Sequence, residues 1–289
     1  MAHAWGVDYI EPDVVITKDD KAVVLHDIHI DTTTDVALKF PRKKRSDGRY
    51  YAVDFTLEEI KKLNVFERIN LKSRERVFKS RFSNEAAKRS SFKVPTLIEF
   101  IELVQGLNKT RGVDIGIYPE LKSPEFHMKE GKDIAKIVFN ILENYGYNHP
   151  QANIYVQCFY PPTLKRLRDE FKAKMPLVAL IAENSWKESS IDYNLLQTRK
   201  SIKELSTYVN GIGPYLGQLV KFKNSKLEKT ALVDYAHEFN LEVHPYTHRK
   251  DALPKFFSND EEFFDFIYEE SGVDGIFSDF GDIALKYSR

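Results

Sequence analysis

The chain has 289 residues, 42% of them hydrophobic, which is enough for a large folded core. Its 43 basic and 43 acidic residues balance, so net charge gives no reason to expect nucleic-acid or bulk membrane binding. The single cysteine, Cys158, excludes an intrachain disulfide, and the sequence has no apolar run of the roughly 18 residues that span a membrane.

The first residues have the pattern of a helix end. Residues 1–5 (MAHAW) predict the last turn of a helix, and Gly6 is the residue type that most often ends one. No signal peptide begins at Met1. We interpret the pattern as a helix that is already under way at Met1.

Residues 7–27 predict a strand, a turn at Asp19-Asp20, and a second strand that ends in a His-Asp pair. The first strand is apolar on both faces, which favours a buried parallel strand over a surface hairpin. Its two acids, Glu11 and Asp13, are two positions apart and so share a face. A hard cation such as Mg²⁺ or Ca²⁺ would relieve their repulsion, and His26 is a candidate general acid or base. The alternative is a solvated strand face beside a structural histidine.

Residues 28–94 predict an excursion packed beside the main domain, without a core of its own. The basic cluster at residues 42–45 could bind an anion, but a solvated loop is the favoured interpretation. Thr56 and Glu59 have the spacing of a capping box, which predicts a short helix over residues 56–63. Residues 66–92 are charged and show no regular pattern.

The next two predicted elements are a helix that starts at Pro95 and a strand over residues 114–122. The apolar positions that should face the core of the helix are Ile98, Ile101, Leu103 and Val104. The strand period places Glu120 and Lys122 on one face. A surface ion pair is the alternative for these two residues, but they lie near a strand end, where barrels keep their catalytic groups.

Helices and strands then alternate. The predicted helices are 130–144, 162–171, 201–208, 228–239, 260–270 and 282–287, and the predicted strands are 152–159, 177–182, 211–216, 241–246 and 275–280. No glycine-rich phosphate loop follows any strand, which argues against a dinucleotide-binding fold. The repeat predicts a parallel α/β barrel with seven of the usual eight units, the absent unit preceding Met1.

Several segments together resemble the glycerophosphodiester phosphodiesterases, most closely the bacterial periplasmic or lipoprotein-type branch. They are IEPDVVITKDDKAVVLHD, GIYPELKSPEFHMKEGKDIA, YVQCF, GIGP, HPYT and GIFSDF. The resemblance implies an eight-stranded TIM-type (β/α)8 barrel that forms one domain over residues 1–289. It places the 28–94 excursion as an insertion after the first strand present, and the barrel's own first strand is absent.

The resemblance also implies a mechanism, the metal-dependent hydrolysis of deacylated phospholipids to sn-glycerol 3-phosphate and an alcohol. The residues that match the family's motifs are Glu11, Asp13 and Glu120 for the metal, His26 for acid–base catalysis, and Lys122, Gln157, Phe159 and Tyr246 for substrate binding. The divalent cation would be Ca²⁺ in preference to Mg²⁺. The expected partner is a small-molecule glycerophosphodiester, a homodimer is left open, and the expected location is the periplasm or cell envelope.

One departure from the family affects these expectations. The family's first strand carries a His-Arg-Gly motif that supplies a second histidine and a phosphate-binding arginine, and no such motif occurs here. We therefore expect a copy that starts after this motif and has impaired turnover. Thr32 also stands where relatives commonly have arginine. The alternatives are a phospholipase-D-like barrel enzyme, a non-catalytic surface or interaction protein, and a metal-dependent isomerase or aldolase.

Overall fold

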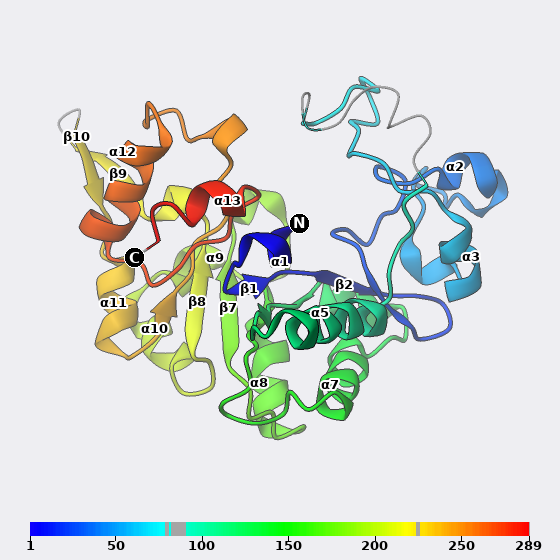
Figure 1. The fold of residues 1–289 in the computed structure, drawn as a ribbon, viewed down its shortest axis with the longest axis horizontal. Coiled ribbons are helices and arrows are strands. Elements are labelled where there is room, and N and C mark those ends of the chain that lie inside the picture. The colour runs from blue at the N-terminus through cyan, green and yellow to red at the C-terminus, as the bar shows by residue number, and fades with distance from the viewer. Residues whose placement is uncertain (79–80, 82–90, 224–225, 289) are drawn as a thin grey trace. The chain divides into compact units, whose positions relative to one another are not determined.

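The computed structural model describes residues 1–78, 81, 91–223 and 226–288. The chain forms two compact units (Figure 1). Unit 1 comprises Met1–Glu11, Leu107–Pro119 and Leu142–Arg289, and unit 2 comprises Pro12–Gly106 and Glu120–Ile141. Among the described residues, no helix is both long and apolar enough to cross a lipid bilayer.

Unit 1 contains the regular alternation of strands and helices that the sequence predicts. Its strands are β1 (Tyr9–Ile10), β4 (Gly116–Ile117), β6 (Val156–Cys158), β7 (Leu177–Ile181), β8 (Gly211–Pro214), β9 (Val220–Lys223), β10 (Lys226–Lys229) and β11 (Glu242–Val243). Its helices are α1 (Ala2–Trp5), α8 (Pro161–Asp169), α9 (Tyr193–Leu196), α10 (Arg199–Leu205), α11 (Leu232–Glu238), α12 (Asp260–Phe264), a π-helical turn (Asp265–Ser271) and α13 (Gly281–Ala284). Short 3-10 turns occupy Asn184–Trp186, Leu216–Gln218 and Lys250–Ala252.

The central strands of unit 1 are parallel. β6, β7, β8 and β11 are neighbours in that order, and β1 pairs with β4. α8 packs on β6 and β7, and α11 packs on β11 and α10 (Figure 1). β8 fits closely between its neighbours because it is rich in glycine. A Cβ atom on Gly211 would lie 2.8 Å from the Glu242 backbone oxygen, so the neighbouring strand leaves no room for a larger side chain there.

Unit 2 contains the insertion and the hairpin that precedes it. Its strands are β2 (Asp13–Ile16), β3 (Ala22–Val24) and β5 (Glu120–Leu121), and its helices are α2 (Val36–Lys39), α3 (Leu57–Lys62) and α6 (Pro124–Lys129). Short 3-10 turns cover Pro41–Lys43 and Ala52–Asp54. Two longer helices, α5 (Leu97–Arg111) and α7 (Ile134–Asn144), have residues in both units. β2 pairs in parallel with β5 and antiparallel with β3.

The insertion shares one hydrophobic core with the hairpin. The fully buried members of this core include Val15 and Val23 from the hairpin and Ile30, Phe55, Ile60 and Leu63 from the insertion. Burying large apolar side chains stabilises a fold by about 1.5–3 kcal/mol each. The hairpin and the insertion therefore pack as one body.

Several local predictions are confirmed. α1 ends at Gly6, whose φ of 83° is the left-handed conformation typical of a helix C-terminus. α3 begins with the predicted capping box, in which the Thr56 side chain accepts from the Glu59 N–H and the Glu59 side chain accepts from the Thr56 N–H.

The two acid-bearing strands are shorter than predicted. The segment 7–16 is divided into β1 and β2 around Glu11-Pro12, and the segment 114–122 into β4 and β5 around Tyr118-Pro119. Proline has no N–H to donate to a ladder, which explains why strand pairing stops at Pro12 and Pro119. The predicted buried parallel strand is confirmed for β2, which pairs in parallel with β5, and the predicted turn and second strand make β2 and β3 an antiparallel pair as well.

Other predicted elements need correction. The predicted helix 130–144 begins only at Ile134, after the separate helix α6. The predicted helix 228–239 begins at Leu232, and Glu228 lies in the β9–β10 hairpin that the sequence pattern missed. Residues 275–280 form no strand, and a single bridge joins Ser278 to His248. In α5, Ile98 and Leu103 are exposed, and only Leu97, Ile101 and Val104 are buried.

The fold class is α/β, as predicted. Among the described residues, no strand pairing closes either set of strands into a barrel. The closed eight-stranded barrel and the single domain over residues 1–289 stay predictions.

Candidate functional site

Two carboxylates lie next to each other in unit 2. β2 and β5 run parallel with Asp13 directly opposite Glu120, and one carboxylate oxygen from each lies within 4.8 Å of the other. Each acid is the first residue of its strand and is followed by buried apolar residues, as is typical of a buried parallel strand. Parallel register therefore places two negative charges side by side.

Lys122 lies between these two acids. Its Nζ atom is 2.7 Å from Glu120 Oε1 and 3.7 Å from Asp13 Oδ1. The side chains of Lys122 and Glu120 are each only 7% exposed. The prediction that they share a face is confirmed, but the alternative of a surface pair is wrong, because both are buried.

The cluster has more negative than positive charge. Burial raises the pKa of the Glu120 carboxyl and the nearby charge of Asp13 raises it further, although Lys122 opposes both effects. Glu120 Oε1 is also buried and lacks a hydrogen bond of good geometry, although Lys122 Nζ lies 2.7 Å from it. A buried carboxylate oxygen without a hydrogen bond, beside a second carboxylate, fits a hard divalent cation.

His26 belongs to a second polar group in unit 2. It follows β3, and its Nδ1 atom is 2.7 Å from Asp27 Oδ1. Asp27 Oδ2 accepts a second hydrogen bond, from the guanidinium of Arg68. Partial burial acts to lower the pKa of His26, but the hydrogen bond to Asp27 and the charge of Asp13 outweigh this and raise it. Burial likewise acts to raise the pKa of Asp27, yet its bonds to His26 and Arg68 hold that pKa far below its usual range.

A buried histidine fixes the loop after β5. His127 on α6 is 1% exposed. Its Nε2 atom accepts from the Ile16 N–H at 3.0 Å, and its Nδ1–H donates to the Lys122 carbonyl oxygen at 3.0 Å. The ring must be neutral with its proton on Nδ1, because a backbone N–H can only donate and a carbonyl can only accept. Sequence reasoning missed His127, Asp27 and Arg68, and only the His-Asp pair offered a signal.

The other predicted site residues lie in unit 1. Glu11 Oε1 accepts a hydrogen bond from Gln157 Nε2 at 3.0 Å, and Gln157 is 2% exposed. Gln157 Oε1 is buried without a hydrogen bond. The rings of Phe159 and Tyr246 meet edge to face with centroids 5.6 Å apart, and the Tyr246 hydroxyl donates to the Ile181 carbonyl oxygen at 2.9 Å.

Each unit brings some of the predicted residues together. Unit 2 brings together Asp13, Glu120 and Lys122, with His26 in the same unit, and unit 1 brings Glu11 to Gln157 and Phe159 to Tyr246. Glu11 precedes Asp13 by two residues, so covalent geometry keeps their Cα atoms within about 7 Å.

A hydrogen-bonded aromatic cluster in unit 1 was not predicted. The Tyr118 hydroxyl is 3.0 Å from His244 Nδ1, and the Tyr155 hydroxyl donates to Glu242 Oε2 at 2.6 Å. Tyr118 and Tyr155 stack with centroids 4.9 Å apart. Burial raises the pKa of the Tyr118 hydroxyl, so it stays protonated and acts as a hydrogen-bonding group.

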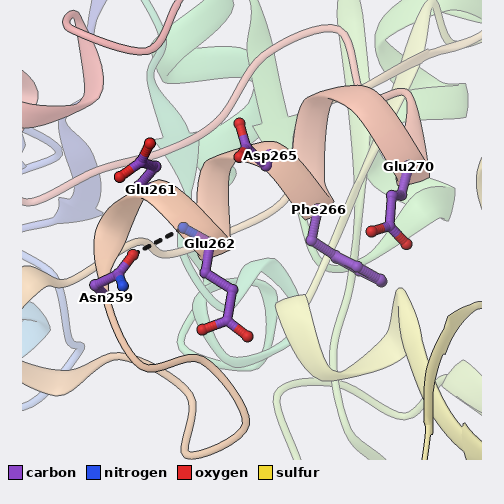
Figure 2. Close-up of a pocket in the computed structure, with 6 residues that line it drawn as sticks. All are labelled: Asn259, Glu261, Glu262, Asp265, Phe266 and Glu270. Carbon is purple, nitrogen blue, oxygen red and sulfur yellow. Dashed lines mark hydrogen bonds between the residues drawn. The ribbon is translucent and has the colours of Figure 1, made fainter.

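A separate concave surface in unit 1 contains none of the predicted residues. It is lined by Asn259, Glu261, Glu262, Asp265, Phe266 and Glu270 (Figure 2). Asn259 caps α12 by accepting from the Glu262 N–H at 2.9 Å. In Figure 2 the four acids project from several sides of one helical segment, which is the usual arrangement on a solvated helix.

Comparison with known proteins gives consistent matches over almost the whole chain. The model of the glycerophosphoryl diester phosphodiesterase family matches residues 1–283. A glycerophosphodiester phosphodiesterase of Haemophilus influenzae is 39% identical over 100% of this chain and 84% of its own length. One of Treponema pallidum is 31% identical over 99% of this chain and 85% of its own length.

Two solved structures have a similar fold. A glycerophosphoryl diester phosphodiesterase structure from Silicibacter pomeroyi aligns with a TM-score of 0.70 and 21% identity, over 99% of this chain and 84% of that one. A phosphodiesterase of Oleispira antarctica, solved with its product sn-glycerol-3-phosphate, aligns with a TM-score of 0.60 and 17% identity, over 98% of this chain and 86% of that one.

Proposed function

Because the chain belongs to the glycerophosphoryl diester phosphodiesterase family, we propose that it hydrolyses glycerophosphodiesters to sn-glycerol 3-phosphate and an alcohol at a divalent cation. The enzyme class is shown by the relatives: the chain is a glycerophosphodiester phosphodiesterase, a phosphoric diester hydrolase. The product and the cation dependence are the proposed parts. The product is the one that the Oleispira antarctica enzyme was solved with.

The observation that supports cation dependence best is the pairing of Asp13 with Glu120. These carboxylates face each other in register. Among the described ion pairs, the ammonium of Lys122 is the one positive group that contacts them. We propose that both bind the cation together with Glu11, which precedes Asp13 by only two residues. All ligands would then be oxygen atoms, as Ca²⁺ and Mg²⁺ require, and Ca²⁺ is the proposed ion.

A divalent cation at this position would withdraw charge from the phosphate oxygens and favour attack at phosphorus. It would also change what Lys122 can do. Lys122 Nζ pairs with Glu120 at 2.7 Å, and a cation on the carboxylates would weaken that pairing and leave the ammonium available to a phosphate oxygen. Lys122 is therefore the proposed phosphate-binding residue of unit 2.

His26 is the proposed proton-transfer residue. Its Nδ1–H donates to Asp27, so the Nε2 atom is the one available to a reacting oxygen. The side chain is 59% exposed, which leaves room for a substrate to approach it. General acid–base catalysis by such a group contributes roughly 10²–10⁴-fold to rate. In unit 1, Gln157, Phe159 and Tyr246 are the proposed substrate-contacting residues.

The proposed function can be tested with purified protein, glycerophosphocholine and Ca²⁺. We expect release of sn-glycerol 3-phosphate, which a coupled dehydrogenase assay detects, and loss of this release when a chelator removes the cation. Intact sphingomyelin should not be cleaved. Product release that is the same with and without chelator would refute cation dependence, and cleavage of sphingomyelin would favour the phospholipase-D-like alternative.

Two further expectations from the sequence remain proposals. Turnover should fall below that of a relative that carries a His-Arg-Gly motif, which this sequence lacks. The proposed location is the periplasm or cell envelope, and cell fractionation with an antibody would test it.

A further inference from the structure

Three side chains of unit 2 form a continuous hydrogen-bonded chain. Arg68 donates from its guanidinium to Asp27 Oδ2, and Asp27 Oδ1 lies 2.7 Å from His26 Nδ1. Arg68 is 41 residues away from Asp27 in sequence and comes from the charged stretch of the insertion that shows no sequence pattern. The guanidinium of Arg68, from the insertion, is thus hydrogen-bonded to Asp27, and Asp27 in turn is hydrogen-bonded to the proposed catalytic residue His26.

The backbone around Arg68 is held on both sides. The Val77 N–H donates to the Arg68 carbonyl oxygen at 2.9 Å, and the Ile69 N–H donates to the Thr32 carbonyl oxygen at 2.9 Å. A bridge between Ile69 and Arg76 closes the turn that follows. Arg68 is therefore presented from a fixed strand-like segment, and its side chain is 28% exposed. The planar guanidinium is also pre-organised for a carboxylate, so it loses less entropy per hydrogen bond than a flexible ammonium would.

This geometry decides which nitrogen of His26 carries the proton. An ionised carboxylate only accepts hydrogen bonds, so Asp27 requires a proton on Nδ1 and leaves Nε2 free of one in the neutral ring. Asp27 has two oxygens, and Arg68 occupies the second. Without that bond the Asp27 carboxylate could rotate, and its hold on the His26 ring would weaken.

We propose that Arg68 is a positioning residue, which acts through Asp27 to fix the ring orientation and the Nδ1–H tautomer of His26. The inference rests on the proposed catalytic role of His26 and adds a residue of the insertion to it. Among the described residues, the charged groups that act on His26 are Asp27, Asp13, Lys122 and Glu120, and the contact of Arg68 with it runs through Asp27.

The test compares three substitutions in the full chain. Arg68→Met removes the guanidinium and keeps an unbranched apolar stem, and Arg68→Lys keeps the positive charge. Arg74→Met is the matched control, because Arg74 lies in the same loop and is exposed. Thermal unfolding of each variant first confirms that it folds.

Two kinds of measurement are made on each variant. Steady-state kinetics with glycerophosphocholine give kcat and KM separately, and NMR gives the ¹⁵N chemical shifts of the His26 ring. We expect Arg68→Met to lower kcat about tenfold or more, within the roughly 10²–10⁴-fold that acid–base catalysis contributes, with KM unchanged. The ¹⁵N shifts should move from the Nδ1–H tautomer toward a mixture. Arg68→Lys should recover part of both, and Arg74→Met should match the wild-type protein.

A His26→Ala variant separates the two proposals. If His26→Ala keeps wild-type kcat, the proposed role of His26 fails, whatever Arg68 does. If His26→Ala loses turnover but Arg68→Met keeps wild-type kcat and an unchanged His26 tautomer, the positioning role of Arg68 alone is overturned. The ¹⁵N shifts report on Arg68 even where turnover is low.

Discussion

Asp13 lies directly opposite Glu120 in a parallel ladder, and the described contacts give the pair a single ammonium, that of Lys122. A buried and a partly buried carboxylate with one ammonium are electrostatically incomplete, since charges inside a protein interact more strongly than in water. The imbalance should affect both cation binding and the stability of unit 2.

Removing one carboxylate should weaken cation binding. Glu120→Gln keeps the shape of the side chain and removes its charge, so Ca²⁺ affinity should fall by ~10-fold or more, because ligand charge sets the affinity of oxygen sites. Titration calorimetry measures this. Glu58→Gln is the control, because Glu58 is 82% exposed and pairs only with Lys62 among the described ion pairs. Equal Ca²⁺ affinity in Glu120→Gln and the wild-type protein would reject Glu120 as a ligand.

Removing the ammonium should make stability depend on the cation. Lys122→Met leaves the buried Glu120 and the partly buried Asp13 without their ion-pair partner, and breaking a buried pair costs about 3–5 kcal/mol. A bound divalent cation would replace the lost charge, so Ca²⁺ should raise the melting temperature of Lys122→Met more than that of the wild-type protein. Differential scanning fluorimetry with and without Ca²⁺ measures this. A Lys132→Met control, which removes the more peripheral pair with Asp20, should behave like wild type. The same Ca²⁺ shift in Lys122→Met and wild type would contradict the prediction.

The imidazole of His127 should make unit 2 sensitive to acid. Burial lowers its folded-state pKa below the ordinary value of 6.5, so the unfolded chain binds more protons as the pH falls. The stability that neutral His127 contributes is therefore complete above about pH 6.5 and is lost as the pH falls toward the lower folded pKa. His127→Gln does not titrate, and its side-chain oxygen can accept from Ile16.

Urea unfolding at about pH 7.5 and about pH 5.5 tests this prediction. Stability should fall less between the two values in His127→Gln than in the wild-type protein. His149→Gln is the control, because His149 is exposed and should change nothing. An identical fall in His127→Gln and wild type would show that His127 does not carry the pH dependence.

His26 should be needed for turnover but not for cation binding. His26→Ala should lower kcat by roughly 10²–10⁴-fold, because it removes a proton-transfer group, while Ca²⁺ affinity stays that of the wild-type protein. Steady-state kinetics with glycerophosphocholine and calorimetry with Ca²⁺ measure the two effects separately. Loss of both activity and Ca²⁺ binding would instead assign His26 to the cation site or to the stability of unit 2.

Short-range features of the site could be predicted from the sequence because their physics is local. The capping box of Thr56 and Glu59 involves neighbours on one helical turn, and the pairing of Glu120 with Lys122 follows from the alternation of side chains along a strand. Gly6 ends α1 for a similar reason, since glycine adopts the left-handed conformation without a steric cost.

Where prediction failed, a partner distant in the chain determined the structure. Residues 275–280 are as apolar as a strand and make backbone hydrogen bonds to Pro245 and His248, but these amount to the single bridge between Ser278 and His248 and not to a ladder. Residues 228–239 begin with a segment that pairs back on β9, and this pairing prevails over its helical pattern. Strand formation depends on a neighbouring strand more than on the segment itself.

The sequence by itself determined the family, the α/β class and which acids, histidine and lysine are candidates for the site, because residue types and short spacings are enough to recognise them. Only the tertiary structure decided which groups hold them in place. Arg68 reaches Asp27 and His127 reaches Ile16 across 41 and 111 residues, respectively. Hydrogen bonds over such separations leave no local pattern, because they form only once the chain has folded and buried the groups that make them.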